Sequence, residues 1–382
     1  MPAFHTPPLP TAPPDAQAAT PAVTPTTQAS YRTHERTWPA VLTLFFLAPA
    51  VGEMLSGSTP PMMFVNPFSL LLETGLYGSG AVLTRELVRR RGLGWGSVLL
   101  LGAAYGILEE GLTLTSWFNP YWPDLQGLAS YGRLLDTNWV WALGLTTYHA
   151  VVSITIPILL VETLFPRIAD RPWLGRRGLR GYVAWLSLIS GFTLLAFGFL
   201  AFSQTNCATQ GQIRLCLPGY AHPPLMWFWA LGLAASLVAL AVSPRTPTTA
   251  QPVKIRRAPG LWRLRLTGLG GTIAFFFLLW AGPSIISAAW VVMLLIVGLI
   301  ALAAWRVRWW AARPGWGIEH QLALATGALS FFLLLAPLLE FGGPHPGKIM
   351  TGISLVAVLW LTLFITLARR AGRTARATLG TP

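Results

Sequence analysis

The chain has 382 residues, of which 53% are hydrophobic and 10% are charged. A soluble domain would carry about 25% charged residues, so this composition excludes an ordinary soluble protein. The net charge of +14 is common among nucleic-acid-binding proteins, but here the basic residues lie in the connections between apolar stretches, where membrane topology accounts for them. We therefore expect no nucleic-acid partner.

The N-terminal segment, residues 1–37, is rich in Pro, Thr and Ala. Residues 1–30 contain one charged residue, Asp15, and no basic stretch followed by an apolar core, so we expect no cleavable signal peptide. Such a composition cannot bury enough apolar surface to fold, which predicts a disordered cytoplasmic tail.

Ten apolar stretches follow, each close to the roughly 20 residues that a helix needs to cross a bilayer. They cover approximately residues 39–55, 63–84, 95–118, 138–165, 182–202, 223–242, 266–281, 284–304, 318–339 and 350–368. The least distinct boundary is the seventh, where only Gly282 and Pro283 indicate a turn. The sequence predicts an all-α polytopic integral membrane protein of about ten transmembrane helices, with helices 1–5 in residues 38–202 and helices 6–10 in residues 223–368.

The basic residues predict an orientation. Of the 27 Lys and Arg residues, all but Arg133, Arg214 and Lys348 lie at the termini or in every second connection. Basic loops are retained on the cytoplasmic side, so both termini, including the basic tail at residues 369–382, are expected in the cytoplasm, with the protein in the cell (inner) membrane. Nine spans would place residues 306–313 outside, so the arginines favour ten.

Two outer connections stand out in this topology. Residues 203–222 contain both cysteines, Cys207 and Cys216. Because disulfides persist in oxidising compartments, an outer location favours a Cys207–Cys216 disulfide over two free thiols. Residues 119–137 mix aromatic and charged side chains, and we expect them to form a short interfacial helix that caps the bundle.

Ionisable residues inside the apolar stretches concentrate in the first four. A charged side chain at the bilayer centre costs roughly 2.5–3.5 kcal/mol on insertion scales, so each such residue needs a reason. The residues concerned are Glu53, Glu73, Glu109, Glu110, His149 and Glu162. Four of them lie at a similar depth, roughly 12–16 Å below the outer ends of three consecutive spans. Because consecutive antiparallel helices usually pack as neighbours, we expect a cluster of Glu73, Glu109, Glu110 and His149.

Hydroxyl groups lie about one helical turn from these residues and could satisfy them. Tyr105 and Thr113 flank Glu109, Ser69 and Tyr77 flank Glu73, and Ser153 follows His149. Adjacent residues of an α-helix point about 100° apart, so we expect only one of Glu109 and Glu110 to do chemistry. The other would hold it or face a second helix.

The remaining carboxylates receive structural interpretations. Glu53 and Glu340 lie near the outer ends of their spans and are interpreted as interfacial carboxylates. Glu162 and Glu319 lie near the inner ends, where we expect them to pair with arginines. His320 lies at a predicted span boundary and is assigned no role.

A Glu/His cluster in a membrane has three physical uses, which the residues alone leave open. It can activate water, either as a general base or through a bound divalent metal. It can carry protons or bind a cation in a transporter. It can also be a hydrogen-bonded network that holds helices together in a non-catalytic scaffold subunit.

The segment Ile107–Thr113 (ILEEGLT), followed one span later by Leu145–His149 (LTTYH), resembles the CAAX protease and bacteriocin-processing family of glutamate-dependent intramembrane proteases. That family pairs a Glu-Glu motif on one helix with an aromatic-xxx-His motif on another. The resemblance covers approximately residues 63–202, and Leu114 and Leu145 stand where the family has an arginine and an aromatic residue.

This resemblance implies a membrane-embedded hydrolase that acts on a membrane protein or peptide. Glu110 or Glu109 would be the base that activates water. His149 would orient the water or stabilise the oxyanion, and Glu73 would support the site. A proton- or cation-coupled transporter and a scaffold subunit are the alternatives.

Overall fold

The apolar stretches of the chain become helices in the computed structural model, which describes residues 36–201, 206–210, 213–217, 220, 224–243, 257–342 and 348–379. The predicted disordered tail lies outside the described residues except for its last two positions. Side chains are not described at residues 126–127, 201, 206–217, 224 and 371–379.

In the first half of the chain, α-helices alternate with wider π-helical turns. The α-helices are α1 (Trp38–Pro49), α2 (Pro61–Phe64), α3 (Pro67–Glu73), α4 (Ser79–Arg90), α5 (Trp95–Gly106), α6 (Trp139–Tyr148), α7 (Ile156–Leu164) and α8 (Arg176–Thr193). The π-helical segments are η1 (Ala50–Leu55), η2 (Thr74–Gly78), η3 (Ile107–Thr113), η5 (His149–Thr155) and η7 (Leu194–Ala201). Short 3₁₀ helices are η4 (Pro123–Leu128) and η6 (Pro166–Ile168).

The second half is more regular, with one π-helical segment among its described elements. Its elements are α9 (Pro224–Val242), α10 (Leu261–Phe276), η8 (Phe277–Ala281), α11 (Gly282–Ile285), α12 (Ala289–Ala311), α13 (Ile318–Phe341) and α14 (Ile353–Leu379). Two small antiparallel hairpins complete the described chain: β1 (Arg133–Leu134) with β2 (Thr137–Asn138), and β3 (Asn206–Gln210) with β4 (Ile213–Leu217).

Eight helices in the described part of the chain are long and apolar enough to cross a membrane. They are Trp38–Leu55, Trp139–Leu164, Arg176–Leu200, Leu225–Val242, Leu261–Ile285, Ala289–Ala311, Ile318–Phe341 and Ile353–Arg370. Each coincides with a predicted span. The other two predicted spans are also helical, at residues 67–90 and 95–113, but they are more polar. The all-α polytopic membrane fold is therefore confirmed.

Two boundaries differ from the prediction. α11 contains Gly282 and Pro283, and the chain turns after it, at residues 286–288. The seventh and eighth predicted spans are nevertheless separate helices. α14 continues to Leu379, so much of the predicted basic tail is helical. Arginine and alanine are strong helix formers, which explains why the helix does not end with the apolar stretch.

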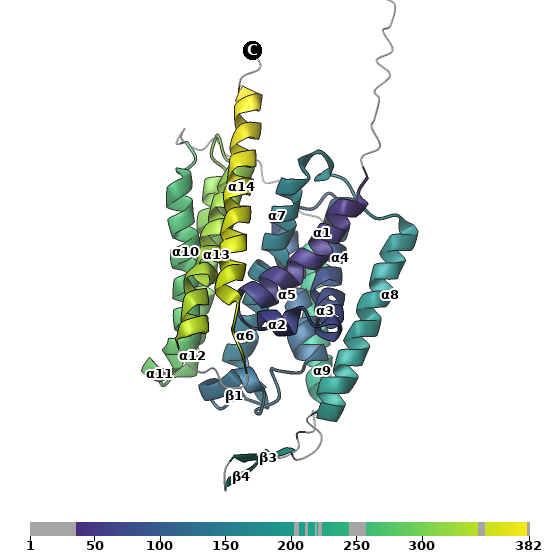
Figure 1. Cartoon of the computed structure of the whole chain (residues 1–382), viewed down its shortest axis with the longest axis vertical. Helices are drawn as coiled ribbons and strands as arrows, with labels where there is room; N and C mark the ends of the chain where they lie inside the picture. The colour runs from purple at the N-terminus through teal and green to yellow at the C-terminus, as the bar shows by residue number, and fades with distance from the viewer. Residues whose placement is uncertain are drawn as a thin grey trace, which may run out of the picture. The chain divides into compact units, whose positions relative to one another are not determined.

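The helix from Trp139 to Leu164 is central to the bundle, because 72% of its apolar window is buried. One face contributes to a core with α1, α4, α5 and α8, and the other contributes to a core with α10, α12, α13 and α14. In Figure 1, α14 rises toward the C-terminus at the top, while the β1–β2 hairpin lies at the bottom of the bundle. The hairpin belongs to the predicted outer connection and α14 ends in the arginine-rich region, so this arrangement is consistent with the expected orientation.

Glycines allow the closest helix crossings. Pro49 has no N–H to donate to the carbonyl of Phe45, one turn earlier in α1. A Cβ atom at Gly78 would lie 2.2 Å from that carbonyl oxygen, so η2 packs directly on the backbone of α1. Gly268 and Gly327 have the same effect where α10 meets α13, as small residues do in membrane bundles.

The outer connection between η3 and α6 holds the 3₁₀ helix η4 and the β1–β2 hairpin, in agreement with the expected short helix. Arg133 fixes this connection by donating to the carbonyls of Phe118 and Asp136, both at 2.8 Å. The Tyr131 hydroxyl donates to the carbonyl of Ile286 at 2.7 Å, which ties the connection to the second half of the chain.

The β3–β4 register pairs Cys207 directly with Cys216, although the two side chains lie outside the described residues. Directly opposed residues of an antiparallel pair have Cα atoms about 4.5–5.5 Å apart, within the range that a disulfide bridges. We expect one intramolecular disulfide in protein purified without reductant. Mass spectrometry after alkylation should show two modified cysteines only after reduction, and alkylation of both without reduction would contradict it.

Candidate functional site

His149 lies at the centre of a group of buried ionisable side chains. Its Nε2 atom lies 3.1 Å from Oε1 of Glu110, and its Nδ1 atom lies 3.3 Å from Oε2 of Glu109. Ser153 completes the contacts, with its hydroxyl 3.1 Å from Nδ1. The exposed fractions are 1% for His149, 1% for Glu109 and 7% for Glu110, so the three groups are enclosed by protein. The predicted convergence of the two glutamates on His149 is present.

Both glutamates reach the same imidazole, whereas only one was expected to be placed for chemistry. The expectation assumed α-helical geometry, with adjacent residues about 100° apart. Glu109 and Glu110 lie instead in the π-helical segment η3, and His149 lies in the π-helical segment η5 of the neighbouring helix. Nε2 of His149 lies within hydrogen-bond distance of Glu110, whereas Nδ1 has Ser153 as its hydrogen-bond partner and Glu109 as a close neighbour.

Four π-helical segments meet at this site, and such segments are frequent at functional sites. η1 contributes Glu53, η2 contributes Tyr77, and η3 and η5 contribute the glutamates and His149. Gly106 permits the close approach of α5 to η5, because a Cβ atom there would lie 2.9 Å from Cβ of His149. Apolar periodicity does not distinguish π from α turns, so this feature was not predicted.

Ser116 and Trp141 hold Glu110 from the outer side, and sequence reasoning missed both. The Ser116 hydroxyl donates to Oε2 of Glu110, and Nε1 of Trp141 donates to the Ser116 oxygen at 3.1 Å. Thr115, immediately before, has a φ of 59°, which is uncommon for a non-glycine residue, and strained residues of this kind cluster at active sites and switch regions. Ser116, a polar residue near the outer end of the third predicted span, was the available signal.

Glu53 belongs to this group, which corrects its interpretation as an interfacial carboxylate. The Tyr77 hydroxyl donates to Oε1 of Glu53, and the Thr59 hydroxyl lies 2.9 Å from Oε2 of Glu53 and 3.1 Å from Oε1 of Glu73. The ring of Tyr77 lies 5.7 Å from the ring of His149. The connection 56–60 after η1 folds back over the group, which span-by-span reasoning could not anticipate.

Glu73 is therefore connected to the centre only indirectly, through Thr59, Glu53 and Tyr77. Within the described residues its hydrogen bond is to Thr59 and not to His149, so its supporting role stays a prediction. Tyr77 binds Glu53 rather than the expected Glu73.

Two buried polar atoms near His149 have no hydrogen-bond partner among the described residues: the hydroxyl of Tyr105 and Oε2 of Glu109. The ring of Tyr105 lies 6.1 Å from that of His149. Within the same described residues, no three His, Cys, Asp or Glu side chains are arranged to hold a metal ion. The two unpartnered atoms leave room at this site for a hydrogen bond to a water molecule or to a reacting polar group.

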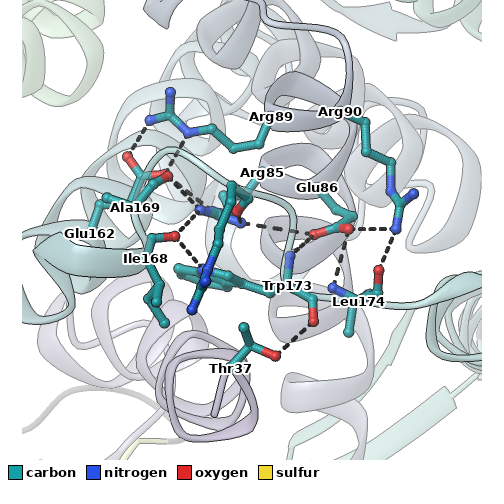
Figure 2. Close-up of polar contacts among 11 residues, drawn as sticks. Thr37, Arg85, Glu86, Arg89, Arg90, Glu162, Ile168, Ala169, Trp173 and Leu174 are labelled. Carbon is teal, nitrogen blue, oxygen red and sulfur yellow. Dashed lines mark hydrogen bonds and ion pairs between the residues drawn. The ribbon is translucent and has the colours of Figure 1, made fainter. Parts of the chain in front are cut away.

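A second polar network lies at the arginine-rich end of the first four helices (Figure 2). Arg85, predicted as one of several topology-determining arginines, is 0% exposed. Its Nε atom donates to Glu162 at 3.1 Å, and its terminal nitrogens donate to the carbonyls of Ala169 and Arg171 at 2.6 and 2.8 Å. Its guanidinium lies 3.4 Å from the ring centroid of Trp173.

The same network explains the neighbouring charges. Arg89 pairs with Glu162 through two nitrogens, which confirms the expected pairing of Glu162 with arginines. Glu86 accepts from the backbone N–H groups of Trp173 and Leu174 at 2.9 and 3.2 Å (Figure 2). The connection after α7 is thus tied to α4 by buried charges, which hold this end of the bundle together.

The remaining predicted residues have structural contacts. The Thr113 hydroxyl donates to the backbone carbonyl of Glu109, and Glu340 accepts from the N–H groups of Gly352 and Ser354 at the start of α14. Glu319 lies 3.1 Å from Nδ1 of His320 and not against an arginine, so that pairing was wrong within the described residues. His320 is its neighbour in the first turn of α13, which brings the two side chains together.

Replacing Arg85 by glutamine should destabilise the protein by roughly 3 kcal/mol, because it removes a buried cation from two carboxylates and several carbonyls. Arg91→Gln is the matched control, since Arg91 is exposed in the same cluster and should change stability by less than about 0.5 kcal/mol. Thermal unfolding of both variants in detergent measures the difference. Equal melting temperatures would show that the Arg85 network does not stabilise this end.

Comparisons with known proteins identify the family of the chain. A family model described as an uncharacterized membrane protein family matches residues 42–378. An "Uncharacterized protein" of Archaeoglobus fulgidus is 27% identical over 221 residues, covering 50% of this chain and 68% of the relative. No solved structure matches. Because the family match covers most of the chain, the protein belongs to this uncharacterized membrane protein family.

Proposed function

We propose that the protein is a hydrolase embedded in the cell membrane, with the arginine-rich end of the bundle in the cytoplasm. One observation carries this proposal: both nitrogens of the buried His149 face carboxylates that come from a single π-helical segment. A glutamate beside a histidine can take a proton from water and deliver it to a leaving group. The resemblance of Ile107–Thr113 and His149 to glutamate-dependent intramembrane proteases points to the same chemistry.

The contacts separate the roles of the two glutamates. Both oxygens of Glu110 are occupied, by His149 and by Ser116. Oε2 of Glu109 has no hydrogen-bond partner among the described residues, although it lies 3.3 Å from Nδ1 of His149. We assign Glu109 as the general base and Glu110 as the residue that positions His149.

In the proposed reaction, Glu109 accepts a proton from water as the water oxygen attacks the carbonyl carbon of a peptide bond. Protonated His149 lies beside the same carboxylate and stabilises the oxyanion that forms. When the bond to nitrogen breaks, the proton held by Glu109 passes to the leaving amine. In this proposal Tyr105, whose ring lies 6.1 Å from that of His149, would bind the substrate carbonyl.

The substrate class follows from the location of the site. Its depth within helices of a membrane bundle suits a peptide segment that enters from the bilayer, and a membrane protein or peptide is therefore the proposed substrate. The enclosed state of Glu109 and His149 means that helices must part before a substrate binds. We propose that the helices part toward the outer face, which would provide that route.

Glu109→Gln should lower the rate of hydrolysis by about 10²–10⁴-fold, because glutamine cannot accept the proton of water. Glu110→Gln should cause a smaller loss, because glutamine can still accept from Ser116. The assay uses protein in liposomes with synthetic peptides that contain one apolar stretch of about 20 residues. Mass spectrometry in ¹⁸O-labelled water detects products that carry the label in a new carboxyl group.

The control is Glu319→Gln, which removes a carboxylate at the other end of the bundle and should leave the rate unchanged. Each variant must retain the melting temperature of the wild type to within a few degrees. Full activity of folded Glu109→Gln would contradict the proposed base. Activity in the double variant Glu109→Gln, Glu110→Gln would contradict the hydrolase itself.

A second candidate, a proton-coupled transporter, is favoured by one specific observation. Glu73, Thr59, Glu53 and Tyr77 form a continuous series of hydrogen bonds that leads toward His149. Glu53 and Glu73 are half-buried while His149 is fully buried, so the series runs from a more accessible region into the core. Buried carboxylates and histidines in series can carry protons through a membrane protein.

Under this second candidate, Tyr77→Phe should slow proton entry into liposomes under a pH gradient about tenfold, since it removes one hydrogen bond of the series. Tyr182→Phe is the matched control, because Tyr182 packs against Phe45 outside the series. A pH-sensitive dye inside the liposomes reports the flux. Equal flux through wild type, Tyr77→Phe and protein-free liposomes would remove this candidate. If the wild type shows neither hydrolysis nor proton flux, the scaffold subunit is the remaining function.

A further inference from the structure

A pocket of about 570 Å³ lies away from the Glu/His site. Residues of α4, α5 and α7 line one side of it, and residues of α13 and α14 line the other. Its wall combines charged and apolar side chains: Arg89, Glu162, Asp170 and Arg370 with Trp95 and Ile318. Neither candidate function above uses it. The pocket therefore needs an occupant that has both a polar and an apolar part.

The position of the pocket fixes its depth relative to a membrane. Ile318 is the first residue of one apolar span, and Arg370 is the last residue of another. Both lie on the pocket wall, so the pocket is at the level where the hydrocarbon of a bilayer ends and the headgroups begin. Trp95 adds an aromatic side chain of the kind enriched at this level.

Arg89 presents a fixed cation to the pocket. Its Nε atom donates to Glu162 at 2.8 Å and one terminal nitrogen also binds Glu162, which locks the guanidinium in place (Figure 2). Its other terminal nitrogen makes no hydrogen bond to any residue in the described part of the chain, and the side chain is 20% exposed. A guanidinium held on one edge can bind a phosphate with the other.

The charged side chains that line the pocket balance one another, with Arg89 and Arg370 against Glu162 and Asp170. Both oxygens of Glu162 are already bound, by Arg85 and Arg89, and Arg85 behind the wall also lies 3.8 Å from Glu86. Glu162 therefore has no oxygen to spare for a ligand, and the free edge of Arg89 is the group that would bind an anion.

We propose that this pocket binds an anionic phospholipid, with the phosphodiester between Arg89 and Arg370 and the start of an acyl chain against Trp95 and Ile318. The lipid would fill the space between α7 and the pair α13–α14, and so join the two halves of the bundle. This inference does not depend on the chemistry at His149.

The test measures lipid binding to the full chain after delipidation in detergent. Native mass spectrometry compares phosphatidylglycerol with phosphatidylcholine on the wild type and on two variants. Arg370→Gln removes a pocket cation, whereas Arg369→Gln removes the neighbouring exposed cation, which does not line the pocket. We expect one tightly bound phosphatidylglycerol on the wild type and on Arg369→Gln, and about fivefold weaker binding to Arg370→Gln.

Three outcomes would overturn the proposal. Equal binding of phosphatidylcholine would show that the negative charge is not recognised. If Arg369→Gln and Arg370→Gln weaken phosphatidylglycerol binding equally, the lipid is attracted by the basic surface and does not occupy the pocket. Displacement of phosphatidylglycerol by inorganic phosphate at the same concentration would identify a soluble anion as the ligand. The melting temperature of each variant is measured first, and only variants that match the wild type are compared. A folding defect is therefore not mistaken for a loss of lipid binding.

Discussion

The burial of charge in an apolar bundle is the constraint on which the other features of this protein depend. An ionised group far from water is tolerated only when protein partners replace its hydration. Arg85 satisfies this condition with Glu162, three backbone carbonyls and Trp173, and His149 satisfies it with Glu109 and Glu110. The first four spans and the connection after α7 provide these partners, and the later helices surround them with apolar surface.

Most of the fold could be predicted from the sequence, because each helix boundary depends on hydropathy and charge within a short window. The site could be predicted only in part. Depth along consecutive helices brought Glu109, Glu110 and His149 together correctly. Glu53 was misassigned, because its neighbours Tyr77 and Thr59 come from another helix and from a folded-back connection, and no window contains such contacts.

The burial of Arg85 is a second feature that could not be predicted from the sequence. In sequence it is one arginine in a cluster whose members all serve to orient the protein. In the structure it is fully enclosed, whereas Arg91 is exposed. What distinguishes them is the connection after α7, whose carbonyls and Trp173 close over Arg85. Positive charge at a span end therefore combines two functions, topology and tertiary packing, that composition cannot separate.

The contact of Gly78 with the carbonyl of Phe45 sets the distance between two helices. Backbone packs directly on backbone there, so any side chain at residue 78 would push η2 away from α1. Glu53 lies farther along the continuation of α1, and its partner Tyr77 is adjacent to Gly78 on the other helix. The hydrogen bond between Tyr77 and Glu53 therefore depends on the absence of a side chain at the neighbouring position.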